Sequence, residues 1–316
     1  MKILITGVHG FVGSNLVSAL SEKNTIYGLD IISPTKKGVK YTFSWDFLDK
    51  EGEIPDVDAI IHLAGKAHDT KNQAAADVYF KVNRDLTIKV FDYFCAHPSI
   101  KKFVFFSTAK AAADKVDGVL TEDVVPSPVG PYGESKIAAE NYILSCMRAN
   151  PDAFAGRGVY IFRPCMIHGP GNKGNLNLLY NVVRKGIPWP LGAFENRRTF
   201  TSVENICFAV NGVLTKDVES GIYNMGDDEA LSTNELIEEI CKSLGKKARI
   251  WRLPKGLMFF MARLGGWLHL PLDSERLRKL TEDYVASNAK IKGALGVERM
   301  PVDARVGLMR TLESFK

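Results

Sequence analysis

The sequence has few cysteines and no paired cysteine motif. Its 316 residues include five cysteines, an odd number. No two of them form a Cys-x-x-Cys pair, so neither a disulfide framework nor a zinc site is predicted, and no other metal site is expected. Free thiols persist in a reducing compartment, which makes a cytoplasmic location the default expectation. The five are Cys95, Cys146, Cys165, Cys207 and Cys241.

Long apolar runs are also missing. A membrane-spanning helix needs roughly 20 consecutive apolar residues, and no segment reaches that length, so no integral membrane span is predicted. The apolar run near the N-terminus is too short for the core of a signal peptide. The most apolar stretch, residues 256–270, is interrupted by Arg263, His269 and a Gly-Gly pair. We expect it to form a helix that packs on its own protein or on a partner, in preference to one that lies on a membrane surface.

Charge of one sign is not in large excess. There are 41 Lys and Arg against 36 Asp and Glu, which gives a net charge of +5. That balance predicts no nucleic-acid partner, although a few converging cations would suit a small anionic molecule. A hydrophobic content of 46% and a charged content of 24% are typical of a globular chain. At about 150 residues per domain, the length suggests two domains.

Up to residue 165, short apolar runs alternate with longer helical patterns. Continuous apolar strands separated by helices predict a parallel sheet covered on both faces, the doubly wound α/β architecture. Helices are expected at Phe11–Lys23, in a long stretch that ends at Phe94, and at Tyr132–Ala149. The predicted strands are Lys2–Thr6, Thr25–Asp30, Tyr41–Trp45, Ala59–Leu63, Lys102–Ser107 and Gly158–Arg163.

After residue 165 the pattern is less regular. Helices are expected at Leu176–Lys185 and at Glu235–Leu244, the second opened by a capping box between Ser232 and Glu235. We therefore predict one domain over residues 1–165 and a smaller, mixed α/β domain over 166–316. Strands near residues 200–226, such as Gly221–Met225, could return to the first sheet.

Three glycines follow the first predicted strand and open the first predicted helix. Glycine allows a tight turn and a close approach of the backbone to a pyrophosphate, at Gly7, Gly10 and Gly13. The helix that begins at Phe11 and Val12 then offers free N–H groups to phosphates. This strand–turn–helix context predicts a dinucleotide-binding site.

An acidic residue ends the second predicted strand. Asp30, 17 residues after Gly13, is placed to accept hydrogen bonds from an adenosine ribose. Because a carboxylate repels a 2′-phosphate, the sequence favours NAD over NADP. Lys36 and Lys37 lie close by in the sequence and weaken that preference.

A tyrosine and a lysine stand four residues apart at the start of a predicted helix. Tyr132 and Lys136 would share one helical face, with about 6 Å between them. At an effective dielectric constant of 20, a cation about 4 Å from a phenol contributes up to ~4 kcal/mol, or ~3 pKa units. We therefore expect Lys136 to lower the pKa of Tyr132 toward neutrality, so that the phenol can serve as general acid or base.

Taken in order, these motifs resemble the extended branch of the short-chain dehydrogenase/reductase superfamily, in particular its NAD-dependent epimerase/dehydratase family, with a Rossmann-type fold. The glycine spacing is G-x-x-G-x-x-G, and Tyr132 to Lys136 is the YxxxK motif. The other stretches that carry the resemblance are Trp45-Asp46-Phe47, His62-Leu63-Ala64-Gly65, Asn83, Phe106-Ser107-Thr108, Arg163-Pro164 and His168-Gly169-Pro170-Gly171.

The resemblance implies roles for these residues. Tyr132 would exchange the proton of a substrate hydroxyl, Lys136 would hold the nicotinamide ribose, and Thr108 would hydrogen-bond the same substrate oxygen. Ser107 is the neighbouring hydroxyl and could exchange roles with Thr108. The implied cofactor site comprises Gly7, Gly10, Phe11, Val12, Gly13, Asp30, Asp46, Phe47, Leu63, Ala64, Gly65, Asn83, Ser107, Tyr132, Lys136 and Pro164.

The same resemblance implies a nucleoside diphosphate as part of the substrate. Asn175 and Leu176 would lie near the diphosphate and uracil. Arg198 would bind the phosphates, a task that suits its planar guanidinium. In 4,6-dehydratases of this branch an Asp-Glu pair follows the Thr, whereas Ala109 and Lys110 stand here, which disfavours dehydration.

We therefore expect an NAD-dependent epimerase that transiently oxidises and then reduces C4 of a UDP-hexose or UDP-N-acetylhexosamine. An NAD(P)H-dependent 4-keto-sugar-nucleotide reductase of surface polysaccharide biosynthesis is the alternative. A non-catalytic NAD(P)-sensing protein is a third possibility, disfavoured by the presence of YxxxK. The resemblance also implies a homodimer through a four-helix interface that includes Asn83–Phe94 and Tyr132–Ala149.

Overall fold

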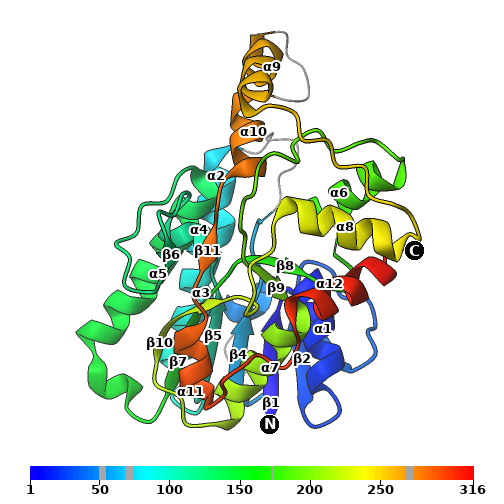
Figure 1. Ribbon diagram of the computed structural model, residues 1–316. Coiled ribbons are helices and arrows are strands. Elements are labelled where there is room, and N and C mark those ends of the chain that lie inside the picture. The colour runs from blue at the N-terminus through cyan, green and yellow to red at the C-terminus, as the bar shows by residue number, and fades with distance from the viewer. Residues whose placement is uncertain (50–54, 68–74, 173, 268–272) are drawn as a thin grey trace.

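A seven-stranded parallel sheet organises the protein. The computed structural model describes residues 1–49, 55–67, 75–172, 174–267 and 273–316. The strand order is β10-β7-β5-β4-β1-β2-β3, and every neighbouring pair is parallel (Figure 1). This confirms the predicted doubly wound α/β fold. The strands are β1 (Lys2–Thr6), β2 (Thr25–Leu29), β3 (Val39–Phe43), β4 (Ala59–His62), β5 (Lys102–Phe106), β7 (Gly158–Pro164) and β10 (Gly221–Met225).

Alternate residues of each central strand enter two different cores. In β1, Ile3 and Ile5 pack on the side of α1 (Phe11–Leu20) and α7 (Val203–Thr215), while Leu4 packs on the side of α3 (Leu86–Ala96) and α5 (Pro131–Ala149). Because both faces are covered, the strands are apolar throughout. The carboxyl ends of the strands are therefore the part of the sheet where polar groups can gather.

A π-helical turn interrupts the long helix that follows β4. The helix starts as α2 (Ala76–Tyr79), widens into η2 (Phe80–Asp85) and continues as α3. Single π turns inside α-helices occur frequently at functional sites because they redirect one side chain. Here the turn contains Asn83, which is fully buried.

The remaining elements form two small sheets and several helices outside the main sheet. Two small parallel sheets pair β8 (Met166–His168) with β9 (Phe200–Ser202), and β6 (Val119–Leu120) with β11 (Val285–Ala286). The capping box predicted between Ser232 and Glu235 is present at the start of α8. The helices and short turns of this region and its connections are η1 (Trp45–Asp49), α4 (Ala109–Ala112), η3 (Pro151–Phe154), α6 (Asn175–Arg184), α8 (Thr233–Ser243), α11 (Ala289–Leu295) and α12 (Ala304–Glu313).

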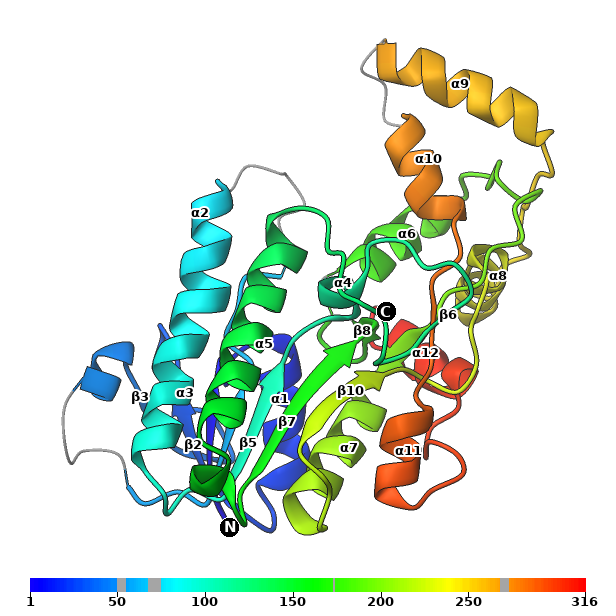
Figure 2. The ribbon, with the colours of Figure 1, turned by 90° about the vertical axis from the view of Figure 1, so that its left-hand side faces the viewer.

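One helical arm extends away from the rest of the molecule. It consists of α9 (Lys255–Trp267) and α10 (Ser274–Thr281), and it forms the far end of the protein in two views related by a quarter turn (Figures 1 and 2). Met258, Ala262 and Gly265 of α9 are buried, so one side of this helix packs on its own protein, as expected for one of the two arrangements; whether a partner covers the other side stays a prediction. Residues 268–270 of the predicted helix lie outside the described residues. Within the described residues, no helix combines the length and apolar character that crossing a membrane requires.

Candidate active site

The glycine turn after β1 has the geometry that its sequence predicts. Gly7 has a φ of +68°, and a Cβ built on it would lie 3.1 Å from the backbone of Ala64. A Cβ on Gly13 would lie 2.4 Å from the carbonyl oxygen of Gly7, so the helix begins in direct contact with the turn. No side chain caps α1, and no acidic residue occupies its first turn. The N–H groups at Phe11, Val12 and Gly13 therefore fit a dinucleotide pyrophosphate.

Asp30 lies against this turn. Its carboxylate accepts hydrogen bonds from the backbone N–H of His9, at 3.0 Å, and of Ile31, at 2.8 Å. Lys36 also contacts the turn: its ammonium donates to Ser14 Oγ at 2.6 Å and to the Val8 carbonyl at 3.1 Å. Burial lowers the pKa of Lys36, and the nearby Asp30 carboxylate partly offsets that effect. The predicted ribose acceptor and a cation thus flank the start of α1 together.

The residues predicted for the adenosine side lie at two strand ends. Asp46 is exposed in η1, and Phe47 stacks on Phe43 with 4.1 Å between ring centroids. After β4, the N–H groups of Leu63 and Ala64 donate to Thr6 Oγ1 at 3.2 and 3.0 Å. These bonds fix the chain after β4 next to the glycine turn.

Asn83 joins three segments of the chain. Its side-chain oxygen accepts from the N–H of Lys66 at 2.7 Å, and its amide donates to Ser135 Oγ at 3.0 Å. A Cβ on Gly65 would lie 3.0 Å from Asn83 Oδ1 and 3.1 Å from the ammonium of Lys136. Asn83 thus holds the segment after β4 against α5, where the predicted catalytic lysine lies.

The side chains of Tyr132 and Thr108 lie close enough together for Thr108 to affect the pKa of the phenol. Tyr132 lies in the first turn of α5, and Thr108 is the N-cap residue of α4. Burial raises the pKa of the Tyr132 phenol, while Thr108 acts in the opposite direction and Tyr79 adds to the increase. In the chain itself, therefore, the expectation that Lys136 brings this pKa down is wrong, because desolvation dominates.

Lys136 is buried beside the tyrosine, four residues further along α5. Its ammonium donates to the carbonyl of Phe106 at 2.8 Å and lies over the ring of Phe105, 4.9 Å from the centroid. Burial lowers the pKa of Lys136 to about 8, and the Glu140 carboxylate partly offsets that effect. The lysine therefore remains mostly protonated at neutral pH.

Ser107 belongs to a different network from Thr108. It donates a short hydrogen bond to Glu140, and the carboxylate of Glu140 also pairs with Arg163, whose Nη2 lies 2.6 Å away. Both charged side chains are almost completely buried, and Arg163 Nη1 has no hydrogen-bond partner among the described residues. Glu140 is not among the site residues predicted from the sequence. The available signal was its position four residues after Lys136, which places it on the same face of α5.

The structure places the other residues predicted to bind substrate, Asn175, Leu176 and Arg198, in different surroundings. Leu176 is buried in the core formed by α6, α8 and α12, so its side chain contributes packing. Asn175 is exposed at the first position of α6. Arg198 is half-buried, lines a small polar cavity with Asp114, and donates to the carbonyl of Lys279. The cavity is also lined by Lys110, Arg278, Lys279, Glu282, Asp283 and Tyr284.

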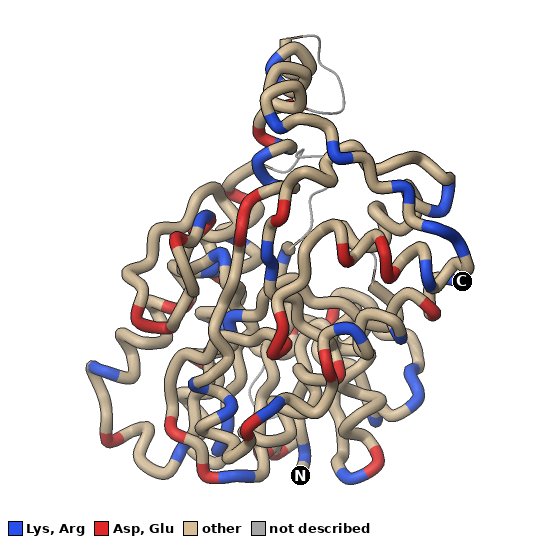
Figure 3. The backbone as a smooth tube through the Cα atoms, in the orientation of Figure 1, with Lys and Arg blue, Asp and Glu red and all other residues tan. Residues whose placement is uncertain are grey.

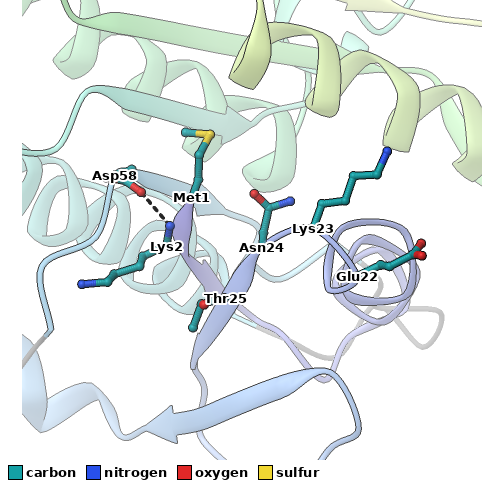
Figure 4. A pocket seen from close by; sticks show the side chains of 7 residues that line it. All are labelled: Met1, Lys2, Glu22, Lys23, Asn24, Thr25 and Asp58. Atoms are coloured by element: carbon teal, nitrogen blue, oxygen red, sulfur yellow. Dashed lines mark hydrogen bonds between the residues drawn. The ribbon is translucent and has the colours of Figure 1, made fainter.

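A second hollow lies at the opposite end of the sheet. It is formed at the amino ends of β1 and β2, where the N–H of Lys2 donates to Asp58 at 2.6 Å (Figure 4). Ligands of doubly wound sheets bind at the carboxyl ends of the strands, so this hollow is not the candidate site. In the described part of the chain, no group of His, Cys, Asp and Glu side chains could hold a metal ion.

Comparison with known proteins agrees with this geometry. The family model described as "NAD dependent epimerase/dehydratase family" matches residues 3–226. The chain is 29% identical to a UDP-glucose 4-epimerase of Vibrio cholerae over 275 residues, which cover 80% of this chain and 78% of the relative. It is 26% identical to an N-acetyl-α-D-glucosaminyl-diphospho-ditrans,octacis-undecaprenol 4-epimerase of Escherichia coli O157:H7, with 92% of this chain and 84% of the relative covered. Dehydratases and a reductase also occur among the relatives.

The solved structures show the same fold. A UDP-glucuronic acid 4-epimerase from Bacillus cereus in complex with NAD superposes with a TM-score of 0.75 at 22% identity, covering 100% of this chain and 98% of that structure. NAD, the cofactor predicted from the glycine turn, is also the cofactor in the name of the matching family. From the glycine turn, the YxxxK helix and this match, the chain belongs to the NAD-dependent epimerase/dehydratase family, a family of enzymes that modify sugar nucleotides.

Proposed function

We propose that the protein is a 4-epimerase of a hexose or N-acetylhexosamine carried on a nucleoside diphosphate, with a UDP-sugar as substrate. The observation that carries the proposal is the placement of Tyr132, in the first turn of α5, near Thr108, the N-cap residue of α4, with the ammonium of Lys136 buried on the same helix. A phenol and a hydroxyl that lie close together can both contact one substrate oxygen. That is the arrangement needed to remove a proton from a sugar hydroxyl and to return it.

Each residue has a separate task in this proposal. Tyr132 takes the proton from O4 of the sugar and later returns it, while Thr108 donates to or accepts from the same oxygen. Lys136 holds the nicotinamide ribose through its ammonium. When bound, NAD supplies a hydride acceptor and a positive charge close to the phenol, which opposes the rise in pKa that burial causes. Ser107 is directed to Glu140, which supports Thr108 as the hydroxyl that faces the substrate.

The substrate class rests on the relatives and on Arg198. One relative is named for UDP-glucose and another for an N-acetylglucosaminyl-diphospho lipid, and both are named as 4-epimerases. Their names share a sugar attached to a diphosphate and inversion at C4. Arg198, which is half-buried and lines a polar cavity, would bind the diphosphate through its planar guanidinium. Asn175, at the first position of α6, would be a second contact of the substrate.

The surroundings of Thr108 support epimerisation over dehydration. Ala109 is buried and carries no acid, and the ammonium of Lys110 lies 2.7 Å from Asp114. The pKa of Asp114 is lowered because its hydrogen bond and ion pair with Lys110 outweigh its burial. Asp114 is therefore ionised at neutral pH and cannot donate the proton that loss of water requires.

A 4-keto-sugar-nucleotide reductase is the alternative, and Lys36 is the observation in its favour. The Lys36 ammonium lies close to both the first turn of α1 and Asp30. A cation at that position could accommodate the 2′-phosphate of NADPH, the reductant on which a reductase would draw. One relative, from Pseudomonas aeruginosa, is named as a GDP-6-deoxy-D-mannose reductase.

A homodimer is part of the proposal. The exposed faces of α3 and α5 would pair with those of a second copy to form a four-helix interface. Tyr142 on α5 donates to Asp92 on α3 at 2.5 Å, so the two helices already form one surface. Light scattering of the purified chain, at about twice the mass of one chain, would support this assembly.

The test is to incubate the purified protein with UDP-glucose or UDP-N-acetylglucosamine, with no added reductant, and to separate the product sugars. The proposal expects the C4 epimer, together with transient absorbance of reduced nicotinamide. Turnover of a 4-keto sugar nucleotide only with stoichiometric NAD(P)H would replace the epimerase by the reductase. A 4-keto-6-deoxy product would mean dehydration. Nucleotide binding without any turnover would mean a sensor.

A further inference from the structure

The outer face of α9 is apolar, and its side chains are exposed in the part of the chain that the structure describes. Its residues are spaced as i, i+3, i+4, i+7 and i+10, which places them on one side of a helix. All five are between 40% and 77% exposed. Monomeric proteins rarely expose a contiguous apolar patch of this kind without a partner. We call this patch the outer face of α9, and it consists of Leu257, Phe260, Met261, Leu264 and Trp267.

The other side of the helix is anchored to the protein. Met258 and Ala262 are buried in a small core with Leu191 and Leu277. The ring of Phe259 meets that of Phe194 edge-on, with 5.7 Å between centroids. The inner side of the helix therefore packs on the protein, which leaves the apolar outer face directed away from that small core.

The chain that leads to α9 is strongly basic. Between residues 242 and 267 the sequence has seven Lys or Arg and no Asp or Glu, and the tube between α8 and α9 correspondingly shows blue segments without red (Figure 3). The acidic residues at the start of α10 have cationic partners on the same helix: Asp273 lies 3.6 Å from Arg276, and Glu275 is paired with Lys279. The chain that leads from α8 into α9 is thus cationic; of its charges, Lys255 and Arg263 lie on α9 itself, and Lys242 on α8 is paired with Glu239. The full set is Lys242, Lys246, Lys247, Arg249, Arg252, Lys255 and Arg263.

We propose that α9 docks this protein on the surface of an anionic phospholipid bilayer. At 13 residues, α9 is about 20 Å long, shorter than the roughly 30 Å core of a bilayer, so it would lie in the plane of the interface. An interfacial helix buries its apolar face at the headgroup boundary and attracts anionic lipids through neighbouring Lys and Arg. Trp267 and Phe260 are suited to that boundary because aromatic rings favour it.

Charge favours a lipid surface over a second copy of the chain. Two copies joined through α9 would bring two basic segments together, and like charges across an interface oppose association. An anionic bilayer offers the opposite charge and an apolar layer in one surface. In Figure 2 the strand arrow of β7 points toward the end of the molecule that carries α9, so docking would turn the side with the candidate site toward the bilayer.

The experiment is flotation of the full chain with vesicles. One set contains phosphatidylglycerol and phosphatidylethanolamine, and the other contains phosphatidylcholine alone. The proposal expects binding to the anionic set that weakens as salt is raised. In the double variant Phe260→Glu and Leu264→Glu, binding should fall by about tenfold or more, since each buried apolar side chain and each repelled charge changes affinity by about that factor.

Val306→Glu is the matched control, because Val306 is also an apolar residue on a helix surface and is 44% exposed. It should bind vesicles like the wild type. Brominated lipids provide a second measurement, since they should quench tryptophan fluorescence less in Trp267→Phe than in the wild type. Equal binding of the double variant and the wild type, or no binding by the wild type, would overturn the proposal. The proposal would also be overturned if the wild type formed a dimer that bound no vesicles and the double variant were monomeric. A second copy of the chain would then cover the outer face of α9.

Discussion

Stability against pH offers a direct view of the buried lysine in the candidate site. Lys136 is 4% exposed, and burial lowers its pKa from the usual value of 10.5 to about 8. Because the folded pKa lies below the unfolded one, the unfolded chain binds more protons between pH 8 and 10.5. Stability therefore rises with pH across that window, and the cost of the buried charge is fully present below pH 8.

The size of the effect follows from the two pKa values. Each pKa unit corresponds to about 1.4 kcal/mol, so the difference between 10.5 and about 8 corresponds to about 3 kcal/mol. The free energy of unfolding of the wild type, minus that of Lys136→Met, should therefore rise by about 3 kcal/mol between pH 8 and 10.5. Other titrating groups contribute to both proteins and cancel in the difference.

The assay is urea denaturation of both proteins at a series of pH values, after bound nucleotide has been removed. The slope with urea should be the same for the two proteins, so that midpoints report stability. If the difference in the free energy of unfolding between the two proteins does not change between pH 8 and 10.5, the Lys136 ammonium is solvated in the folded protein. A difference that falls with rising pH would mean that an anionic partner outweighs burial. Either result would refute the reasoning.

Two further substitutions, each with a control variant, test the buried ion pair and the glycine turn. Arg163→Met leaves the buried carboxylate of Glu140 without its guanidinium and should lower the free energy of unfolding by about 3–5 kcal/mol. The control Arg310→Met removes an exposed ion pair and should change it by less than about 1 kcal/mol. Equal losses of the two variants in urea denaturation would contradict this prediction. Gly13→Ala places a Cβ 2.4 Å from a carbonyl oxygen and should weaken NAD binding by about tenfold or more in calorimetry. Gly293→Ala, which meets no neighbour in helix α11, should bind NAD like the wild type, and a similar loss in both variants would refute the argument from the turn.

Much of the fold could be predicted because it depends on local patterns. The apolar strands, the glycine turn and the capping box of α8 are each specified by residues within a short stretch of sequence. The order of the central strands then follows from the doubly wound architecture. The pairing of Thr108 with Tyr132 could be expected in the same way, from a strand end and a helix start that resemble those of the family.

The rest depends on tertiary contacts that spacing does not reveal. Tyr132 and Lys136 both lie in α5 as predicted, but the predicted fall in the pKa of Tyr132 neglects burial, which acts in the opposite direction. The link between Ser107, Glu140 and Arg163 joins β5, α5 and β7, and it appears only once the strands pair. The apolar pattern of α9 would suit a packed helix equally well, and only its position at the end of the arm shows that the face is uncovered.

The measurement that tests the account most directly is the activity of Tyr132→Phe, which keeps the ring and removes the phenol oxygen. The fold and the affinity for NAD should be preserved, with a dissociation constant close to that of the wild type. Turnover of the UDP-sugar should fall by about 100-fold or more, the usual contribution of a positioned acid–base group. Turnover close to that of the wild type, with NAD still bound, would contradict the assignment of Tyr132 as the residue that moves the proton.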